Sequence, residues 1–227
     1  MTPDVRIQFQ EELRDLERQT LGGLALVATS LERALTALAR EDGDLAALVI
    51  ADDDRIDGRY LEVHQGLLSL LARQAPVAGD LRLVAALLHT IHHIERMGDG
   101  CVNIAKLLPV AAPAGEVAAG LLERLERMGV AASALMDQTK RAFETRDVAL
   151  AEDLVRADDE IDRLNRECFT LALAAEDDPA AREWATRMIL IARSLERLGD
   201  HAVDIGEQTA FVVTGLFREF TDASHPV

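Results

Sequence analysis

Aromatic side chains are scarce in this chain of 227 residues. Phe, Trp and Tyr make up 4% of it, although hydrophobic residues make up 49%. A core built from Ala, Leu, Val and Ile suits close helix packing better than a sheet, because strands favour β-branched and aromatic side chains. We therefore expect an all-α protein.

Cysteine is also scarce. Cys101 and Cys168 are far apart in the chain and have no spacing typical of a metal site. Small buried apolar residues are the favoured interpretation of both. The sequence therefore indicates neither a disulfide framework nor a thiol nucleophile.

Positive charge is in short supply. There are 24 Lys and Arg against 40 Asp and Glu, which gives a formal net charge of −16. Nucleic acid and anionic lipid both require clustered positive charge, so divalent cations or basic protein surfaces are better partners for this chain. No uninterrupted apolar run reaches the roughly 20 residues that span a bilayer, and residues 1–10 lack the layout of a signal peptide. We expect a cytoplasmic protein.

The most informative positive feature is a repeated phrase. Glu-Arg-x-Gly-Asp occurs at Glu95 to Asp99 and again at Glu196 to Asp200, with apolar residues at helical spacing on both sides. Both acids of each copy should lie on one helix face. Like charges at this spacing destabilise an isolated helix by about 0.2–0.5 kcal/mol. Nearby arginines or a bound cation should therefore compensate them.

A second acidic motif repeats as well. Asp53 and Asp57 align with Asp158 and Asp162, again four residues apart within each pair. Both repeats together predict two similar three-helix units, each with acids on its second and third helices. The Pro/Gly/Ala-rich segment near the midpoint is the expected linker. The predicted boundaries are 1–108 for the first unit, 109–115 for the linker, 116–220 for the second unit and 221–227 for a tail.

Periodic apolar residues and helix-breaking signals predict three helices in each unit. In the first unit, the expected helices are residues 5–40, residues 45–73, and one after Pro76 that carries Glu95 and Asp99. In the second unit, they are residues 117–143, one capped by Asp147, and one from Asp178 to about Phe220.

Adjacent antiparallel helices would place the two acidic pairs of each unit side by side. Carboxylates converging in this way form a hard-oxygen site suited to Mg²⁺, Mn²⁺ or iron, to which His201 could add a nitrogen. The alternative is a solvated helix face neutralised by arginines such as Arg55, Arg96, Arg163 and Arg197. Repetition of all four acids in two diverged halves favours cation binding.

At these residues the chain resembles the PhoU family of phosphate-transport regulators. The resemblance covers nearly the whole chain and rests on the two Glu-Arg-x-Gly-Asp copies, the run from Asp200 to Ile205, and the segment from Gln74 to Arg82. It implies two three-helix bundles that carry metal ions on their surfaces. The implied ligands are Asp53, Asp57, Glu95 and Asp99 in one half and Asp158, Asp162, Glu196 and Asp200 in the other. The ion would be iron, Mn, Mg or Zn.

The resemblance also implies a regulator rather than an enzyme. Such a protein links the ATPase of the phosphate ABC transporter to a sensor histidine kinase and restrains the phosphate-starvation response. The chain departs from the family pattern at Gly100, where His is usual, and at Lys106, where Glu is usual. The first metal site is therefore expected to be the weaker one, or to bind a different ion.

Two other functional classes stay open. One is a di-metal enzyme built on a helical bundle, although such sites recruit paired histidines inside the bundle. The other is a purely structural helical dimer; long amphipathic helices in two similar halves also favour a homodimer in the leading interpretation. His89, His92 and His93 precede Glu95 but have no counterparts in the second half, so ordinary surface or hydrogen-bonded histidines are the favoured interpretation.

Overall fold

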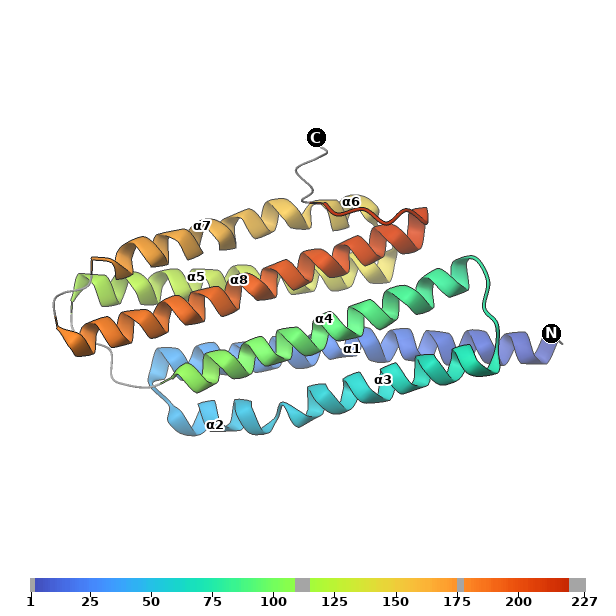
Figure 1. Cartoon of the computed structure of the whole chain (residues 1–227), viewed down its shortest axis with the longest axis horizontal. Coiled ribbons are helices and arrows are strands. Elements are labelled where there is room, and N and C mark those ends of the chain that lie inside the picture. The colour runs from blue at the N-terminus through green and yellow to red at the C-terminus, as the bar shows by residue number, and fades with distance from the viewer. Residues whose placement is uncertain (1–2, 109–114, 175–177, 221–227) are drawn as a thin grey trace.

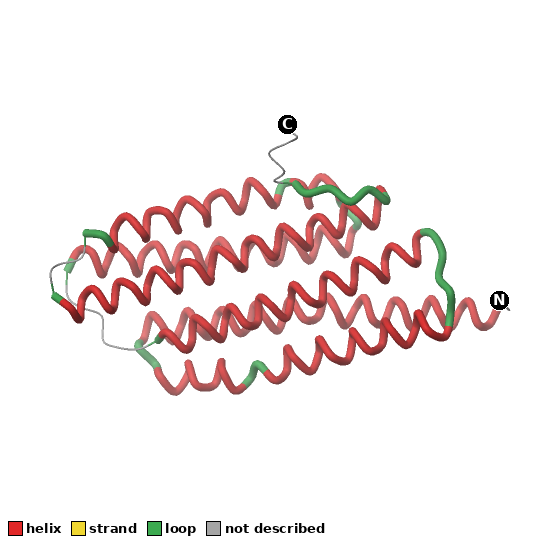
Figure 2. Tube along the Cα trace, in the orientation of Figure 1, coloured by secondary structure: helices red, strands yellow, loops and turns green. Residues whose placement is uncertain are grey.

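The chain folds into long, roughly parallel helices, and the expected all-α class is confirmed (Figures 1 and 2). The computed structural model describes residues 3–108, 115–174 and 178–220, and these residues contain no strand. The first half comprises α1 (Pro3–Arg40), α2 (Gly43–Ala51), α3 (Asp54–Arg73) and α4 (Gly79–Leu107). The second half comprises α5 (Glu116–Thr145), α6 (Val148–Glu152), α7 (Leu154–Ala172) and α8 (Pro179–Thr214).

Each half is a bundle of three helical rods. In the first half α1, α3 and α4 pack against one another, and in the second half α5, α7 and α8 do the same. Small and aliphatic side chains such as Val27, Leu67, Ile91, Leu125 and Ile191 are fully buried between them. The scarcity of aromatic residues is thus matched by a core in which helices lie close together.

The second rod of each half is broken, which corrects the continuous helix expected over 45–73. The first break lies at Asp52 and Asp53, between α2 and α3, and the other lies at Asp153, between α6 and α7. Asp is a weak helix former because its carboxylate competes for local hydrogen bonds. At the first break Asp52 turns toward α1 and pairs with Arg33 at 2.5 Å.

The helix starts follow the expected capping signals. Asp178 accepts hydrogen bonds from the N–H groups of Ala180 and Ala181, with Pro179 in the first turn of α8. Asp147 accepts from Leu150 N–H at 3.0 Å, as expected, but the helix it caps is the short α6. These caps satisfy N–H groups that have no partner within the helix.

The last helix ends earlier than expected. It ends at Thr214 rather than near Phe220, because Gly215 adopts a left-handed conformation with φ of 74°. The N–H of Gly215 donates to Phe211 O at 2.8 Å, which closes the helix in the usual glycine-terminated manner. The expected tail, 221–227, lies outside the described residues. Residues 109–114 of the expected linker also lie outside them.

The two halves are packed against each other along their length. Figure 1 shows α4 and α8 side by side at the centre, and α1 also contacts α5. The α4–α8 contact includes Leu198, whose side chain lies over Gly100. The exact boundaries of the two units stay a prediction.

One helix, α1, is long and apolar enough by composition to cross a membrane. Its apolar side chains Phe9, Leu13, Leu24, Val27 and Leu31 are buried in the core. A core helix of a globular bundle satisfies the same length and hydropathy criteria. The burial of these side chains accounts for the composition of α1.

Candidate metal centres

The first acidic patch forms where the start of α3 lies beside the middle of α4. Asp53 occupies the N-cap position of α3, yet its side chain makes no capping hydrogen bond. Burial raises its pKa to about 6, and repulsion from Asp57, Asp99 and Glu95 contributes. The structure therefore brings together the four carboxylates that the sequence grouped in this half.

The second acidic patch has the same construction on α7 and α8. Burial raises the pKa of Asp158 to about 7, and repulsion from Asp200, Asp162 and Glu196 adds to the effect. The pKa values of Glu196 and Asp200 are also raised, again chiefly by burial. Such shifts record a concentration of negative charge in a partly desolvated place.

A glycine in each repeated phrase lets the two helices approach. A methyl group added at Gly98 would lie 2.9 Å from Ile56 Cγ2 and 3.3 Å from Asp53 Oδ1. A methyl group at Gly199 would overlap Asp158 Oδ1 outright. The glycine of Glu-Arg-x-Gly-Asp therefore makes room for the carboxylate that the facing helix contributes.

Arginines compensate part of this charge, as the solvated-face interpretation required. Arg96 lies 3.4 Å from Glu95 and 3.2 Å from Asp99, and Arg193 pairs with Glu196. The side chains of Arg96 and Arg193 are about half exposed, and ion pairs of exposed arginines contribute little to stability. They contact the patches from the solvent side and leave three buried carboxylate oxygens without a hydrogen bond.

Buried carboxylate oxygens without a hydrogen-bond donor remain in both patches. They are Asp158 Oδ1, Glu196 Oε2 and Glu95 Oε2, the last with ion-pair contacts to Arg96 at 3.4 Å and His92 at 4.0 Å but no hydrogen bond. Buried polar atoms in native proteins nearly always have a partner, so an unpaired carboxylate oxygen fits a bound cation. The residues present thus suit hard metal ions.

In neither acidic patch do three carboxylate oxygens converge closely on one point, among the described residues. In the part of the chain that the structure describes, three ligand atoms lie within 4.8 Å of one another at His93, His201 and Asp204, and not within either acidic patch. Mutual repulsion, which the raised pKa values record, favours this wider spacing.

A histidine cluster was missed by sequence reasoning. His93 of α4 faces His201 of α8, and their Nδ1 atoms lie 3.2 Å apart. Asp204 Oδ2 lies 3.3 Å from the first Nδ1 and 3.4 Å from the second. The expected nitrogen from His201 therefore points to the interface between the halves. Burial is the main reason why the pKa of His93 falls to about 4.

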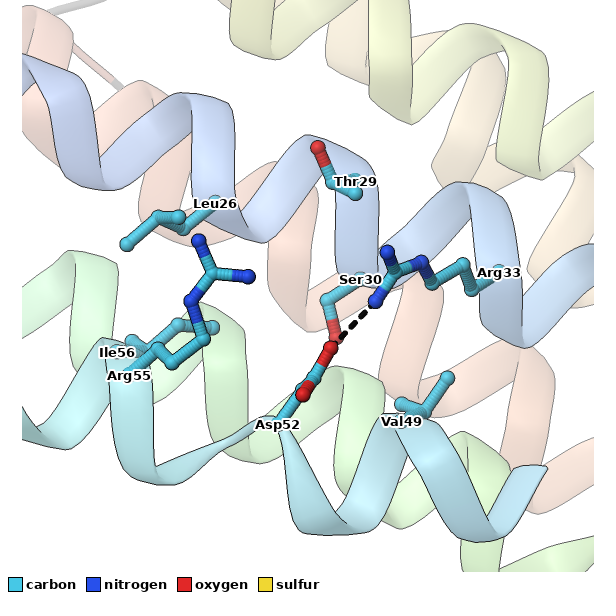
Figure 3. A pocket seen from close by; sticks show the side chains of 8 residues that line it. All are labelled: Leu26, Thr29, Ser30, Arg33, Val49, Asp52, Arg55 and Ile56. Carbon is cyan, nitrogen blue, oxygen red and sulfur yellow. Dashed lines mark hydrogen bonds and ion pairs between the residues drawn. The ribbon is translucent and has the colours of Figure 1, made fainter. Parts of the chain in front are cut away.

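A small cavity lies next to the first patch, between α1 and the break that separates α2 from α3 (Figure 3). Figure 3 shows Arg33 directed at Asp52 across its mouth, with Ser30 and Arg55 also in its wall. Its volume is about 90 Å³. Pockets for substrates of drug size are several times larger, at about 300–1,000 Å³, so this cavity offers room only for waters or a small ion.

Comparison with known proteins places the chain in a family. The model of the PhoU domain matches it twice, over residues 24–108 and 125–209. The chain belongs to the PhoU family. The two matches correspond to the two helical bundles, and each contains one acidic patch.

Curated relatives are similar over almost their whole length. A PhoU homolog of the phosphate-specific transport system from Caulobacter vibrioides is 32% identical over 95% of this chain and 94% of its own. The corresponding protein from Deinococcus radiodurans is 33% identical over 93% and 99%. Both are named accessory proteins of phosphate-specific transport.

Solved PhoU structures share the fold. The phosphate transport system regulatory protein PhoU from Streptococcus pneumoniae superposes with a TM-score of 0.81 and 28% identity, over 92% of this chain and 99% of that one. PhoU from Pseudomonas aeruginosa superposes with the same score and identity, over 92% and 100%. The resemblance first seen in the repeated phrases is thereby confirmed. The names of these relatives describe accessory and regulatory proteins of phosphate transport.

Proposed function

We propose that this chain is a metal-binding regulatory adaptor that negatively modulates phosphate uptake and the phosphate-starvation response. Its partners would be the ATPase of the phosphate ABC transporter and a sensor histidine kinase, and the chain itself would act in the cytoplasm. Support comes from membership of the PhoU family and from relatives named as accessory proteins of phosphate-specific transport. No second function is favoured by a specific observation.

The observation that carries the metal part of the proposal is the repeated group of four carboxylates, in which Asp158 Oδ1, Glu196 Oε2 and Glu95 Oε2 are buried without a hydrogen-bond donor. Asp53, Asp57, Glu95 and Asp99 would hold metal ions on the first half, and Asp158, Asp162, Glu196 and Asp200 would hold them on the second. Iron, Mn, Mg and Zn all accept carboxylate oxygens. When bound, the ions supply positive charge that joins α3 to α4 and α7 to α8. The carboxylates themselves would hold these helix faces in the geometry that a partner protein contacts.

The first patch would be the weaker of the two. Lys106 lies close enough to Asp53 to lower the pKa of that carboxyl, so a fixed positive charge already occupies part of its surroundings. Gly100 supplies no ligand where the family usually has His. A cation gains less electrostatic energy from a patch that is already partly neutralised.

Protein contacts would use the faces beside the patches. Leu61 and Leu68 of α3 are about half exposed, and the exposed acids Asp57 and Glu62 lie on the same helix. Apolar anchors with a charged rim are typical of protein interfaces. A basic partner surface, or a second copy of the chain in a homodimer, would bury them.

The decisive experiment combines metal content with partner binding. The double variant Asp158→Asn, Glu196→Gln removes two charges of the second patch and preserves side-chain shape. We expect elemental analysis to show about half the metal of the wild-type chain, and pull-down with the transporter ATPase to weaken in parallel. Asp159→Asn is the matched control, because Asp159 neighbours Asp158 on α7 but is exposed.

Each result has a distinct meaning. Full metal content in the double variant would show that the second patch does not hold the ions. Loss of metal with unchanged ATPase binding would remove metal from the docking mechanism while leaving the metal sites intact. Loss of both signals in Asp159→Asn as well would point to a general effect of charge rather than to the patch.

A further inference from the structure

The histidine cluster lies between the two halves of the protein, whereas each acidic patch lies within one half. His93 belongs to the first half, whereas His201 and Asp204 belong to the second, so the cluster spans the α4–α8 contact. Both histidine side chains are largely buried, at 18% and 17% exposure, while Asp204 is 40% exposed. The cluster is therefore closed by protein on the inside and accessible along one edge.

The three ligand atoms form an almost equilateral triangle. Its sides are 3.2 Å between the two Nδ1 atoms and 3.3 and 3.4 Å from these atoms to Asp204 Oδ2. Zinc binds nitrogen and oxygen at about 2.0–2.2 Å in tetrahedral sites, which places neighbouring ligands about 3.3 Å apart. The triangle has the dimensions of one face of such a tetrahedron.

Hydrogen bonds and a bound cation are alternative ways to satisfy this triangle. A neutral imidazole carries one N–H, and a carboxylate only accepts. If each Nδ1 carries the proton of its ring, both rings can donate to Asp204 Oδ2, at 3.3 and 3.4 Å. If each Nδ1 is unprotonated, three acceptors converge and two of them lie 3.2 Å apart. A cation at the centre is attracted by all three atoms at once.

The three residues of the histidine cluster differ from the residues at the equivalent positions of the internal repeat. In the internal repeat His201 aligns with Gly100, His93 with Ser194 and Asp204 with Asn103. The structure places Gly100 close to the backbone of Ser194, just as it places His201 beside His93. The α4–α8 interface thus has two equivalent positions, and only one of them carries imidazoles.

We propose that His93, His201 and Asp204 bind one divalent transition-metal ion of the zinc type and thereby join the two halves of the protein. Two imidazole nitrogens and one carboxylate oxygen favour zinc, cobalt or nickel over magnesium or calcium, which prefer oxygen ligands alone. Water is the natural fourth ligand on the exposed edge. This site shares no ligand with the acidic patches, although His201 and Asp204 lie near enough to Asp200 to affect the pKa of that carboxyl. It does not depend on the proposed regulatory function.

A band of aromatic and histidine rings leads to the site. Successive ring centroids lie 6.3 Å apart from Tyr60 to His92, 6.1 Å from His92 to His93, and 5.3 Å from His93 to His201. His92 is half exposed. Its imidazole offers an ion a first contact at the surface beside the buried cluster.

Cobalt spectroscopy on the full chain tests the proposal. Four-coordinate Co²⁺ with nitrogen ligands absorbs visible light strongly, whereas six-coordinate Co²⁺ on carboxylates absorbs weakly. We expect one equivalent of Co²⁺ to give the strong band in the wild type and Zn²⁺ to abolish it by competition. His93→Gln and His201→Gln should each remove the band and weaken Zn²⁺ binding by about 100-fold or more, since loss of even an outer-shell contact costs about 10–100-fold.

Two controls keep the test specific. His64→Gln changes a histidine outside the cluster and should retain both the band and the zinc affinity. Asp158→Asn, Glu196→Gln should also retain them, so failure of the acidic patches is distinguishable from failure of this site. Far-UV circular dichroism verifies that each variant is folded. A wild type without the strong band, or a band unchanged in folded His93→Gln, would overturn the proposal.

Discussion

Glu207 is a buried carboxyl group that the acidic patches do not use. It is 7% exposed, and its Oε1 accepts a hydrogen bond from Phe220 N–H at 2.7 Å. Burial raises its pKa to about 7, against the effect of that hydrogen bond. Sequence reasoning had no means to single out this side chain, because its burial depends on how the segment after Gly215 returns to α8.

At the residue scale this predicts a pH-dependent stability. An acid with a raised pKa binds more protons in the folded than in the unfolded state, so its contribution to stability falls as pH rises from about 4.5 through 7. Glu207→Gln keeps the acceptor and carries no charge. We expect it to unfold with about 1–3 kcal/mol more free energy than the wild type at pH 8.5, and with nearly the same value at pH 4.5.

Urea unfolding at the two pH values measures that difference. Comparison of variant with wild type cancels the titration of the acidic patches, which both proteins share. An equal advantage at both pH values would show that the pKa of Glu207 is the same in the folded and unfolded states, contrary to the effect expected of its burial.

At the element scale, the approach of α7 to α8 depends on Gly199. The sequence predicted that two acids on one helix would lie beside two acids on the next, and the structure brings them together. The spacing of the acids did not explain why a glycine lies between them. The structure explains it, because the Asp158 carboxylate occupies the space that a side chain at 199 would need.

Gly199→Ala should therefore displace the Asp158 carboxylate and separate the two helices. We expect a lower unfolding temperature and loss of the metal held by the second patch, despite the gain in helix propensity of about 1 kcal/mol. Elemental analysis and thermal unfolding followed by circular dichroism give the two measurements.

Gly58→Ala is the matched control, because Gly58 lies in helix α3 with no atom within 4 Å of an added methyl group. There the helix-propensity gain should raise the unfolding temperature. A stabilising effect of the same size at Gly199 would contradict the close approach.

At the scale of the whole molecule, the two halves share one interface along α4 and α8. Leu198 is 1% exposed and lies against Gly100, so its side chain belongs to the contact between halves. Small domains with a shared core unfold cooperatively. We expect Leu198→Ala to cost about 2–5 kcal/mol of unfolding free energy and to shift the unfolding of both halves together.

Two probes separate the halves. Trp184 is the single tryptophan and is buried in the second half, so its fluorescence follows that half, whereas circular dichroism follows all helices. Coincident urea transitions in wild type and variant are the expected result. A tryptophan transition separate from the helical one would show that the halves unfold independently.

The sequence by itself determined the helical class, the duplication and the identity of the acidic pairs. These features depend on local spacing: apolar residues at a period near 3.6, an Asp four residues after an acid, and a capping Asp before a proline. The solved PhoU structures and the family match confirm the class and the repeat. The assignment of metal ligands to the acidic pairs stays a prediction.

Only the tertiary structure decided which histidines meet. The breaks in the second rods and the end of α8 follow local signals, Asp residues and Gly215, that the prediction did not use. The pairing of His93 with His201 joins residues that are far apart in the chain and are not equivalent in the repeat, so no periodicity encodes it. It arises because α4 and α8 pack against each other in one register. Contacts of this kind are set by the fit of whole helices, a property that the local pattern of the chain does not contain.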